Sequence, residues 1–147
     1  MIRPATPSDR AAVEEVVRAA YSIYIARIGK SPGPMLDDYA KLIADEAVSV
    51  FEVDGAIAGL IVLLPAPDHL LLDNVAVHPE RQGGGIGRRL IAFAESEARR
   101  LGYRELRLYT HETMTENIAL YRRLGFVEAG RGHEAGYDRV FMTKPLI

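Results

Sequence analysis

Residues 75–90 constrain the fold and the chemistry of this chain more than any other stretch. The apolar run at residues 70–77 has the composition of a strand, and Pro79 cannot continue it. From Ile86 onward the apolar residues recur at helical spacing. They are Ile86, Leu90, Phe93, Ala94, Ala98 and Leu101. The turn between strand and helix holds four glycines in five positions, namely Gly83, Gly84, Gly85 and Gly87.

The composition of this turn predicts an anion site. Glycine has no Cβ, so the backbone can approach a ligand closely. The N–H groups of the first helical turn have no partner within the helix, and the helix dipole favours negative charge there. Arg81, Arg88 and Arg89 add positive charge. The pattern therefore indicates a cradle for pyrophosphate, although many glycine-rich turns between strand and helix bind nothing.

Two well-known phosphate loops do not fit the turn. A Walker A loop ends in Gly-Lys-Ser/Thr, whereas here Gly87 is followed by two arginines. A dinucleotide-binding motif needs Gly-x-Gly-x-x-Gly after a first strand, but Gly83-x-Gly85 leads to Arg88 and the turn lies in the middle of the chain. The pattern that remains is Gln82-x-x-Gly85-x-Gly87 at the start of a helix.

That pattern resembles the acetyl-coenzyme A signature of the GNAT N-acetyltransferases. A second segment, residues 117–126 with the sequence Asn-Ile-Ala-Leu-Tyr-Arg-Arg-Leu-Gly-Phe, is similar to the late helix of that family, which carries a tyrosine and closes with Leu-Gly-Phe. One helix and one strand are expected between the two motifs, as the family requires. The resemblance implies an acetyl-coenzyme A-dependent N-acetyltransferase.

The order of expected elements agrees with this family. Strands are predicted at residues 2–5, 48–53, 56–64, 70–78, 104–109, 126–128 and 137–143, and helices at 10–20, 35–46, 86–101 and 115–124. The resemblance implies an α+β fold, the GNAT α/β/α sandwich. It has a mixed, mostly antiparallel sheet of about six to seven strands, about four helices and a splayed central strand pair that admits coenzyme A. Residues 1–147 are predicted to form a single N-acetyltransferase domain.

Composition excludes several other classes. A net charge of -2 gives no reason to expect nucleic acid or an anionic membrane as a partner. Because cysteine is absent and the four histidines lack metal-ligand spacing, we expect no disulfide, no cysteine nucleophile and no metal. The apolar run at residues 57–64 is too short to span a membrane, and no signal peptide is visible. A soluble cytoplasmic protein is the expectation, and the sequence leaves a homodimer open.

The resemblance assigns cofactor binding to three groups of residues. The backbone of Val75, Ala76 and Val77 would contact the pantetheine arm and the acetyl group. The pyrophosphate would lie on Gln82, Gly83, Gly84, Gly85, Ile86, Gly87 and Arg88. Asn117 lies one helical turn before Tyr121. The common family pattern has an asparagine seven residues before the tyrosine, where this chain has Met114, so Asn117 either replaces that contact or only braces its helix.

Two side chains are assigned to catalysis by the resemblance. Tyr121 matches the tyrosine that protonates the leaving thiolate, and an unperturbed tyrosine keeps its proton at neutral pH. The alternative is an aromatic core residue. Asp73 precedes the strand residues that bind the acetyl group and would act as the base. Alternatives are His111, Glu112 or a water relay as the base, and a purely structural role for Asp73.

Residues 21–39 are predicted to form one wall of the acceptor site. The segment is irregular, because Gly29, Pro32, Gly33 and Pro34 prevent a continuous helix. Tyr24 and Arg27 are the expected acceptor-binding residues, with Arg27 as the anchor for a carboxylate beside the amine. The alternative is that Tyr24 packs the first two helices together and that Arg27 is a solvated surface residue. The acceptor would be a primary amine of a small molecule or a protein. A non-catalytic acyl-coenzyme A sensor and a transferase for another acyl group remain as alternatives.

Overall fold

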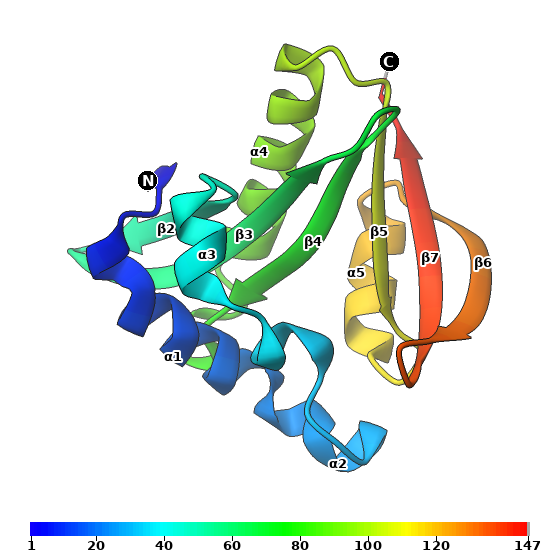
Figure 1. The fold of residues 1–147 in the computed structure, drawn as a ribbon, viewed down its shortest axis with the longest axis horizontal. Coiled ribbons are helices and arrows are strands. Elements are labelled where there is room, and N and C mark those ends of the chain that lie inside the picture. Colours follow the sequence, from blue (N-terminus) through cyan, green and yellow to red (C-terminus); the bar gives the residue numbers. More distant parts are fainter. Residues whose placement is uncertain (147) are drawn as a thin grey trace. The chain divides into compact units, whose positions relative to one another are not determined.

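The computed structural model describes residues 1–146, which form one seven-stranded sheet in the order β1-β2-β3-β4-β5-β7-β6 (Figure 1). The strands are β1 (Ile2–Pro4), β2 (Val48–Val53), β3 (Ala56–Pro65), β4 (Leu70–Val77), β5 (Glu105–His111), β6 (Val127–Glu134) and β7 (Tyr137–Pro145). The pairs β1–β2, β2–β3, β5–β7 and β6–β7 are antiparallel, and β4–β5 is parallel. This confirms the expected mixed, mostly antiparallel sheet.

Five α-helices accompany the sheet. They are α1 (Arg10–Tyr21), α2 (Ile25–Ile28), α3 (Tyr39–Ala44), α4 (Ile86–Arg100) and α5 (Thr115–Arg123). Four 3₁₀ turns are also present: η1 (Pro7–Asp9), η2 (Ser22–Tyr24), η3 (Gly33–Leu36) and η4 (Pro79–Arg81). Because α2 is a single turn of four residues, the other four helices correspond to the number expected from sequence.

The chain divides into two compact units, each built from two separate stretches. Unit 1 contains Met1–Leu63 and Asn74–Ala92, and unit 2 contains Leu64–Asp73 and Phe93–Ile147. In unit 1, α1 and α3 cover one face of β2 and β3, and the first half of α4 packs on the other (Figure 1). Its most deeply buried side chains include Val13, Val17, Val48, Val50, Leu60, Ile61, Val62, Leu90 and Ile91. The single domain expected from the length stays a prediction.

Unit 2 has its own apolar core. Its fully or almost fully buried side chains come from β4, β5, β7, the end of α4, α5 and the segment after it: Leu70, Leu72, Leu106, Leu108, Ala98, Ile118, Tyr121, Phe126, Val140 and Met142. Along β5, buried and half-buried residues alternate, as they do in a strand with one face on a core. The half-buried face of β5 therefore presents its polar and aromatic residues away from this core.

Several local predictions are wrong in their boundaries. The helix expected at 35–46 begins only at Tyr39, because Asp37 is extended and Asp38 caps the helix by accepting the N–H of Lys41 at 3.1 Å. The strand expected at 126–128 continues to Glu134. The segment expected to be irregular contains the short helical turns η2, α2 and η3.

A hairpin joins β2 and β3, the two strands predicted at residues 48–53 and 56–64. Its two-residue turn consists of Asp54 and Gly55, with φ of 51° and 79°. Two consecutive positive φ values define the turn type whose twist matches that of paired strands, and Asp-Gly is among its preferred sequences. This turn sets the register that pairs Val53 with Ala56.

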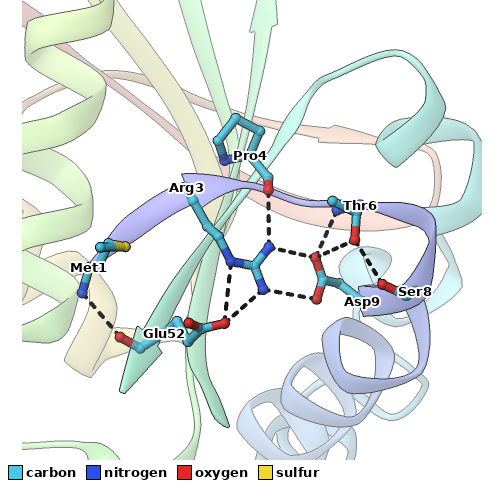
Figure 2. Close-up of polar contacts among 7 residues, drawn as sticks. All are labelled: Met1, Arg3, Pro4, Thr6, Ser8, Asp9 and Glu52. Atoms are coloured by element: carbon cyan, nitrogen blue, oxygen red, sulfur yellow. Dashed lines mark hydrogen bonds and ion pairs between the residues drawn. The ribbon is translucent and has the colours of Figure 1, made fainter. Parts of the chain in front are cut away.

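A polar cluster fixes the start of the chain to η1 and β2 (Figure 2). Arg3 donates two hydrogen bonds to Asp9, at 2.8 and 3.1 Å, and further hydrogen bonds to Glu52. The carboxylate of Asp9 also accepts the backbone N–H of Thr6 at 2.7 Å. The Asp9 side chain is only 11% exposed, and its ion pair with Arg3 holds its pKa at about 2, below the usual 3.8.

Candidate functional site

The glycine-rich turn forms an exposed approach to the N-terminus of α4. Gly83 and Gly85 have φ of 87° and 83°, a conformation that side chains rarely adopt. Among the described residues, no atom lies within 4 Å of the place where a Cβ would stand on either glycine. A ligand can therefore approach the backbone here, and the chain needs glycine at both positions.

The first turn of α4 supplies the chemistry expected of an anion site. The helical hydrogen bonds begin with the N–H of Arg89, which is donated to the carbonyl of Gly85 at 3.0 Å. Helix geometry leaves the N–H groups of residues 86–88 without an acceptor within the helix. Arg88 is exposed beside them, whereas Arg89 lies over the ring of Phe51 at 6.0 Å. These features fit a bound pyrophosphate.

The backbone of β4 before the turn is held closely by its neighbours. The side chain of Gln82 donates to the carbonyl of Val77 at 3.2 Å, so Gln82 braces the strand as well as belonging to the turn. Position 59 on β3 has no room for a side chain. A Cβ on Gly59 would stand 2.9 Å from the carbonyl oxygen of Ala76 and 3.3 Å from side-chain atoms of Ile86 and Leu90. The close approach of β3 fixes β4 against the start of α4.

A buried polar network, missed by the sequence analysis, anchors the same strand. The side chain of Asn74 is 3% exposed; it accepts a hydrogen bond from the Tyr21 hydroxyl at 2.6 Å and donates one to the Tyr39 hydroxyl at 2.9 Å. The Tyr21 hydroxyl also lies 3.0 Å from the carbonyl of Val75, and the Tyr39 hydroxyl donates to the carbonyl of Pro34. An asparagine in register with the buried residues Leu70, Leu72 and Ala76 of this strand was the signal that could have revealed this network.

Asp73 lies at the end of the β4 stretch that belongs to unit 2. Its Oδ1 atom accepts a hydrogen bond from the hydroxyl of Tyr109, on β5, at 3.0 Å. Burial raises the pKa of Asp73, while the Tyr109 hydrogen bond and the charge of Arg139 oppose that rise. A carboxyl with a raised pKa, held in place by a neighbour, has the properties of a general base.

The two alternative bases make other interactions. The Nδ1 atom of His111 lies 2.9 Å from the hydroxyl of Thr113, and the His111 ring packs edge-on against Tyr137. Glu112 forms a long ion pair with Arg131, at 3.8 Å. The choice among Asp73, His111 and Glu112 as the base stays a prediction.

The two candidate residues on α5 belong to unit 2, where Tyr121 is buried and Asn117 is half-buried. Tyr121 is 5% exposed and packs edge-on against Phe126, with ring centroids 5.8 Å apart. The side-chain amide of Asn117 lies 3.9 Å from the sulfur of Met114, one turn earlier. Gly125 ends the helix with φ of 98°, as the Leu-Gly-Phe motif predicts. The catalytic role of Tyr121 and the cofactor contact of Asn117 stay predictions.

The expected acceptor residues lie together in unit 1. The guanidinium of Arg27 lies over the ring of Tyr24, 5.2 Å from its centroid, and Tyr24 packs against Tyr21 at 6.3 Å. Tyr24 is buried and Arg27 is exposed. Their roles in binding an acceptor stay predictions.

The described residues offer neither a membrane-spanning helix nor a cluster of metal-binding side chains. No helix among residues 1–146 is both long and apolar enough to cross a membrane. Within the same part of the chain, no group of three or more His, Cys, Asp or Glu side chains is arranged to hold a metal ion.

Similarity to known proteins places the chain in a family. IAA acetyltransferase from Azospirillum brasilense is 44% identical over 72 residues, which are 48% of this chain and 47% of that protein, so the chain spans about half the length of this relative. Ribosomal protein bS18 alanine N-acetyltransferase from Salmonella typhimurium strain LT2 is 30% identical over 115 residues, covering 72% of this chain and 70% of that protein.

Solved structures of acetyltransferases also resemble this chain in fold. The PaiA N-acetyltransferase from Thermoplasma acidophilum, solved in complex with coenzyme A, has the same fold, with a TM-score of 0.83 and 21% identity over 99% of this chain and 98% of that one. The family model of the acetyltransferase (GNAT) family matches residues 13–126, from α1 to the Leu-Gly-Phe motif. The chain therefore belongs to the acetyltransferase (GNAT) family.

Proposed function

We propose that this protein transfers the acetyl group of acetyl-coenzyme A to a primary amine, directly and within a ternary complex. The observation that carries the proposal is the turn before α4, where two glycines with positive φ open the helix N-terminus to a ligand. Membership in the acetyltransferase (GNAT) family supports the assignment of this turn to acetyl-coenzyme A. The bound coenzyme A of the Thermoplasma relative supports the same cofactor class.

The cofactor would lie on two sets of backbone groups. The N–H groups at residues 82–88, together with Arg88, would hold the pyrophosphate, because helix N-termini favour phosphate. The backbone of Val75, Ala76 and Val77 would bind the pantetheine arm and stabilise charge on the acetyl oxygen. Asn117 would add a contact to the arm. Acetyl-coenzyme A supplies an activated acetyl thioester when it is bound.

The proton transfers would be shared by two side chains. Asp73 would take a proton from the acceptor ammonium, because only the neutral amine has a lone pair for attack. As the new N–C bond forms and the C–S bond breaks, Tyr121 would donate its hydroxyl proton to the departing thiolate sulfur. The nitrogen then loses its second proton to give the amide, and that proton, passed through water, would restore the Tyr121 hydroxyl. Neither step needs a metal.

The acceptor would be a small molecule or a protein with a free amino group. Arg27, held over the ring of Tyr24, would pair with a carboxylate near that amine. The Salmonella relative is named for acetylating an alanine of a ribosomal protein, which adds peptides that begin with alanine to the acceptors to be tested.

The test compares two glycines at opposite ends of α4. Gly85 and Gly102 have φ of 83° and 85°, and both positions are open among the described residues, so a leucine should cost either one about 1 kcal/mol of strain. Calorimetry should show that Gly85→Leu weakens coenzyme A binding at least about tenfold, whereas Gly102→Leu leaves it unchanged. Equal affinities in the two folded variants would contradict the cradle.

Turnover distinguishes an enzyme from a sensor. Free thiol would be followed with acetyl-coenzyme A and a panel of amino acids, linear diamines and alanine-initiated peptides. Acetyl-dependent thiol release with at least one amine supports the transferase. Tight binding of coenzyme A without release for any amine would favour the non-catalytic acyl-coenzyme A module, and release only with another acyl thioester would favour a different acyl group.

A further inference from the structure

The carboxyl of Asp73 and the hydroxyl of Tyr109 meet on one face of two paired strands. The parallel register aligns Leu70 with Leu106 and Leu72 with Leu108. These leucines are buried, so the residues that follow them, Asp73 and Tyr109, have side chains on the opposite face of their strands. The Tyr109 hydroxyl donates to Oδ1 of Asp73 at 3.0 Å.

A third strand holds the tyrosine ring. Arg139 lies on β7, and its guanidinium is 4.1 Å from the centroid of the Tyr109 ring, within the range of a strong cation–π contact. Arg139 is itself paired with Glu134 on β6, and its side chain is only 17% exposed. Tyr109 also packs edge-on against Phe141, at 6.5 Å. Contacts from two sides therefore fix the position of the phenol.

We propose that Tyr109 is a positioning residue that orients the carboxyl of Asp73 for proton transfer, and that Arg139 keeps the Tyr109 ring in the required place. The inference rests on the proposed function, in which Asp73 is the base. It adds which residues hold the base in place and which oxygen of the carboxyl accepts the proton.

The hydrogen bond distinguishes the two oxygens of Asp73. Oδ1 is held by the Tyr109 hydroxyl, so Oδ2 is the atom assigned to the acceptor ammonium. In this step an N–H bond of the ammonium breaks and an O–H bond forms at Oδ2, while the nitrogen keeps the electron pair that later attacks the acetyl carbon. Tyr109 keeps its own proton throughout, because it donates a hydrogen bond and is not consumed.

The groups around Asp73 determine its pH response. Burial raises the pKa of Asp73, and two neighbours lower it, Tyr109 from β5 and Arg139 from β7. Glu134 on β6 faces Arg139 rather than Asp73. His111 shares the Tyr109 face of β5, where its ring packs against Tyr137. Removing the Tyr109 hydroxyl deletes a group that stabilises the carboxylate, so the pKa of Asp73 should rise further.

The first test needs no substrate. The carboxyl carbons of aspartates labelled with ¹³C would be titrated by NMR, and Asp73→Asn would identify the Asp73 signal. We expect an upward shift of the Asp73 pKa in Tyr109→Phe. Tyr103→Phe is the matched control, because the Tyr103 hydroxyl donates to the carbonyl of Ala66 at 2.8 Å and does not contact Asp73. An Asp73 titration that is the same in wild type and Tyr109→Phe would overturn the positioning role.

The second test links this shift to catalysis, with an amine from the panel that turns over. Asp73→Asn should lower kcat/KM about 10²-fold or more, the usual worth of a general base. Tyr109→Phe should lower it about two- to tenfold at neutral pH, the worth of one hydrogen bond. In Tyr109→Phe, the acidic limb of the pH profile of kcat/KM should move to higher pH together with the NMR titration of Asp73. The profile of Tyr103→Phe should match that of wild type.

The outcomes separate the inference from the proposed function. An NMR shift in Tyr109→Phe supports the orienting contact even if no amine turns over, a result that would count only against the transferase. Suppose that the wild type is active and that the NMR titration of Asp73 shifts in Tyr109→Phe. If the acidic limb of the kcat/KM profile then does not move, Asp73 is not the base that Tyr109 orients. Full activity of Asp73→Asn would lead to the same conclusion.

Discussion

Replacing Asp9 with asparagine should make the stability of this protein less dependent on pH. The pKa of Asp9 is about 2 in the folded chain, against 3.8 in an unstructured one, mainly because Arg3 donates two hydrogen bonds to it. A depressed carboxyl pKa adds stability that is complete above the unfolded value and is lost as pH falls toward the folded value. At 1.36 kcal/mol for each pKa unit, Asp9 contributes about 2 kcal/mol at neutral pH.

The assay is urea unfolding followed by circular dichroism, at pH values from 7 down to 2. At pH 7, Asp9→Asn should be less stable than wild type by about 2 kcal/mol, and the two curves should converge as pH falls from about 4 to about 2. Other carboxyl groups titrate in both proteins, so the difference between the curves isolates Asp9.

Glu52→Gln is the control, because Glu52 binds the same arginine but its side chain is 33% exposed. An exposed ion pair is worth less than about 1 kcal/mol, so this variant should differ little from wild type. A constant difference between wild type and Asp9→Asn across the pH range would refute the ion-pair reasoning. It would attribute the loss to the packing around Asp9 instead.

Two further predictions concern the site. Gly59→Ala should lower the free energy of unfolding by about 1–3 kcal/mol and weaken coenzyme A binding in calorimetry, because its Cβ would press on the Ala76 carbonyl at 2.9 Å. Gly132→Ala, whose Cβ would stand 3.5 Å from Phe141, is the control and should be nearly neutral. Equal effects of the two substitutions would contradict the close approach at Gly59. Tyr121→Phe should keep the ring contact with Phe126 and lower kcat about 10²-fold with little change in coenzyme A affinity, and wild-type turnover across the pH range would return Tyr121 to a structural role.

The strongest local signals in the sequence predicted the elements that carry them. The glycine-rich turn before α4 and the Leu-Gly-Phe end of α5 both depend on positive φ, for which glycine is the preferred residue. These signals are local, so the sequence shows them without knowledge of tertiary contacts. The predicted start of α3 was wrong because apolar spacing continued through Leu36, whereas Leu36 belongs to the 3₁₀ turn η3 and Asp37 is extended before the cap at Asp38.

The polar contacts of the site could not be predicted in the same way. Family resemblance predicted Asp73 as a base, but nothing in the sequence links it to Tyr109, 36 residues later. The network of Asn74 with Tyr21 and Tyr39 likewise joins residues 53 and 35 positions apart. Such pairs depend on strand order and register, which the periodicity of one strand does not specify.

Asp73 and Asn74 make a one-residue register shift of β4 energetically costly. The two residues are neighbours in sequence, so their side chains leave the strand on opposite faces, and each is bound by a tyrosine hydroxyl that does not bind the other. If β4 moved by one residue along its partners, the carboxyl would enter the place of the buried amide and its charge would lose water without a cation to compensate it. A single inserted or deleted residue in β4 should therefore be tolerated far less well than one in the loop at residues 66–69.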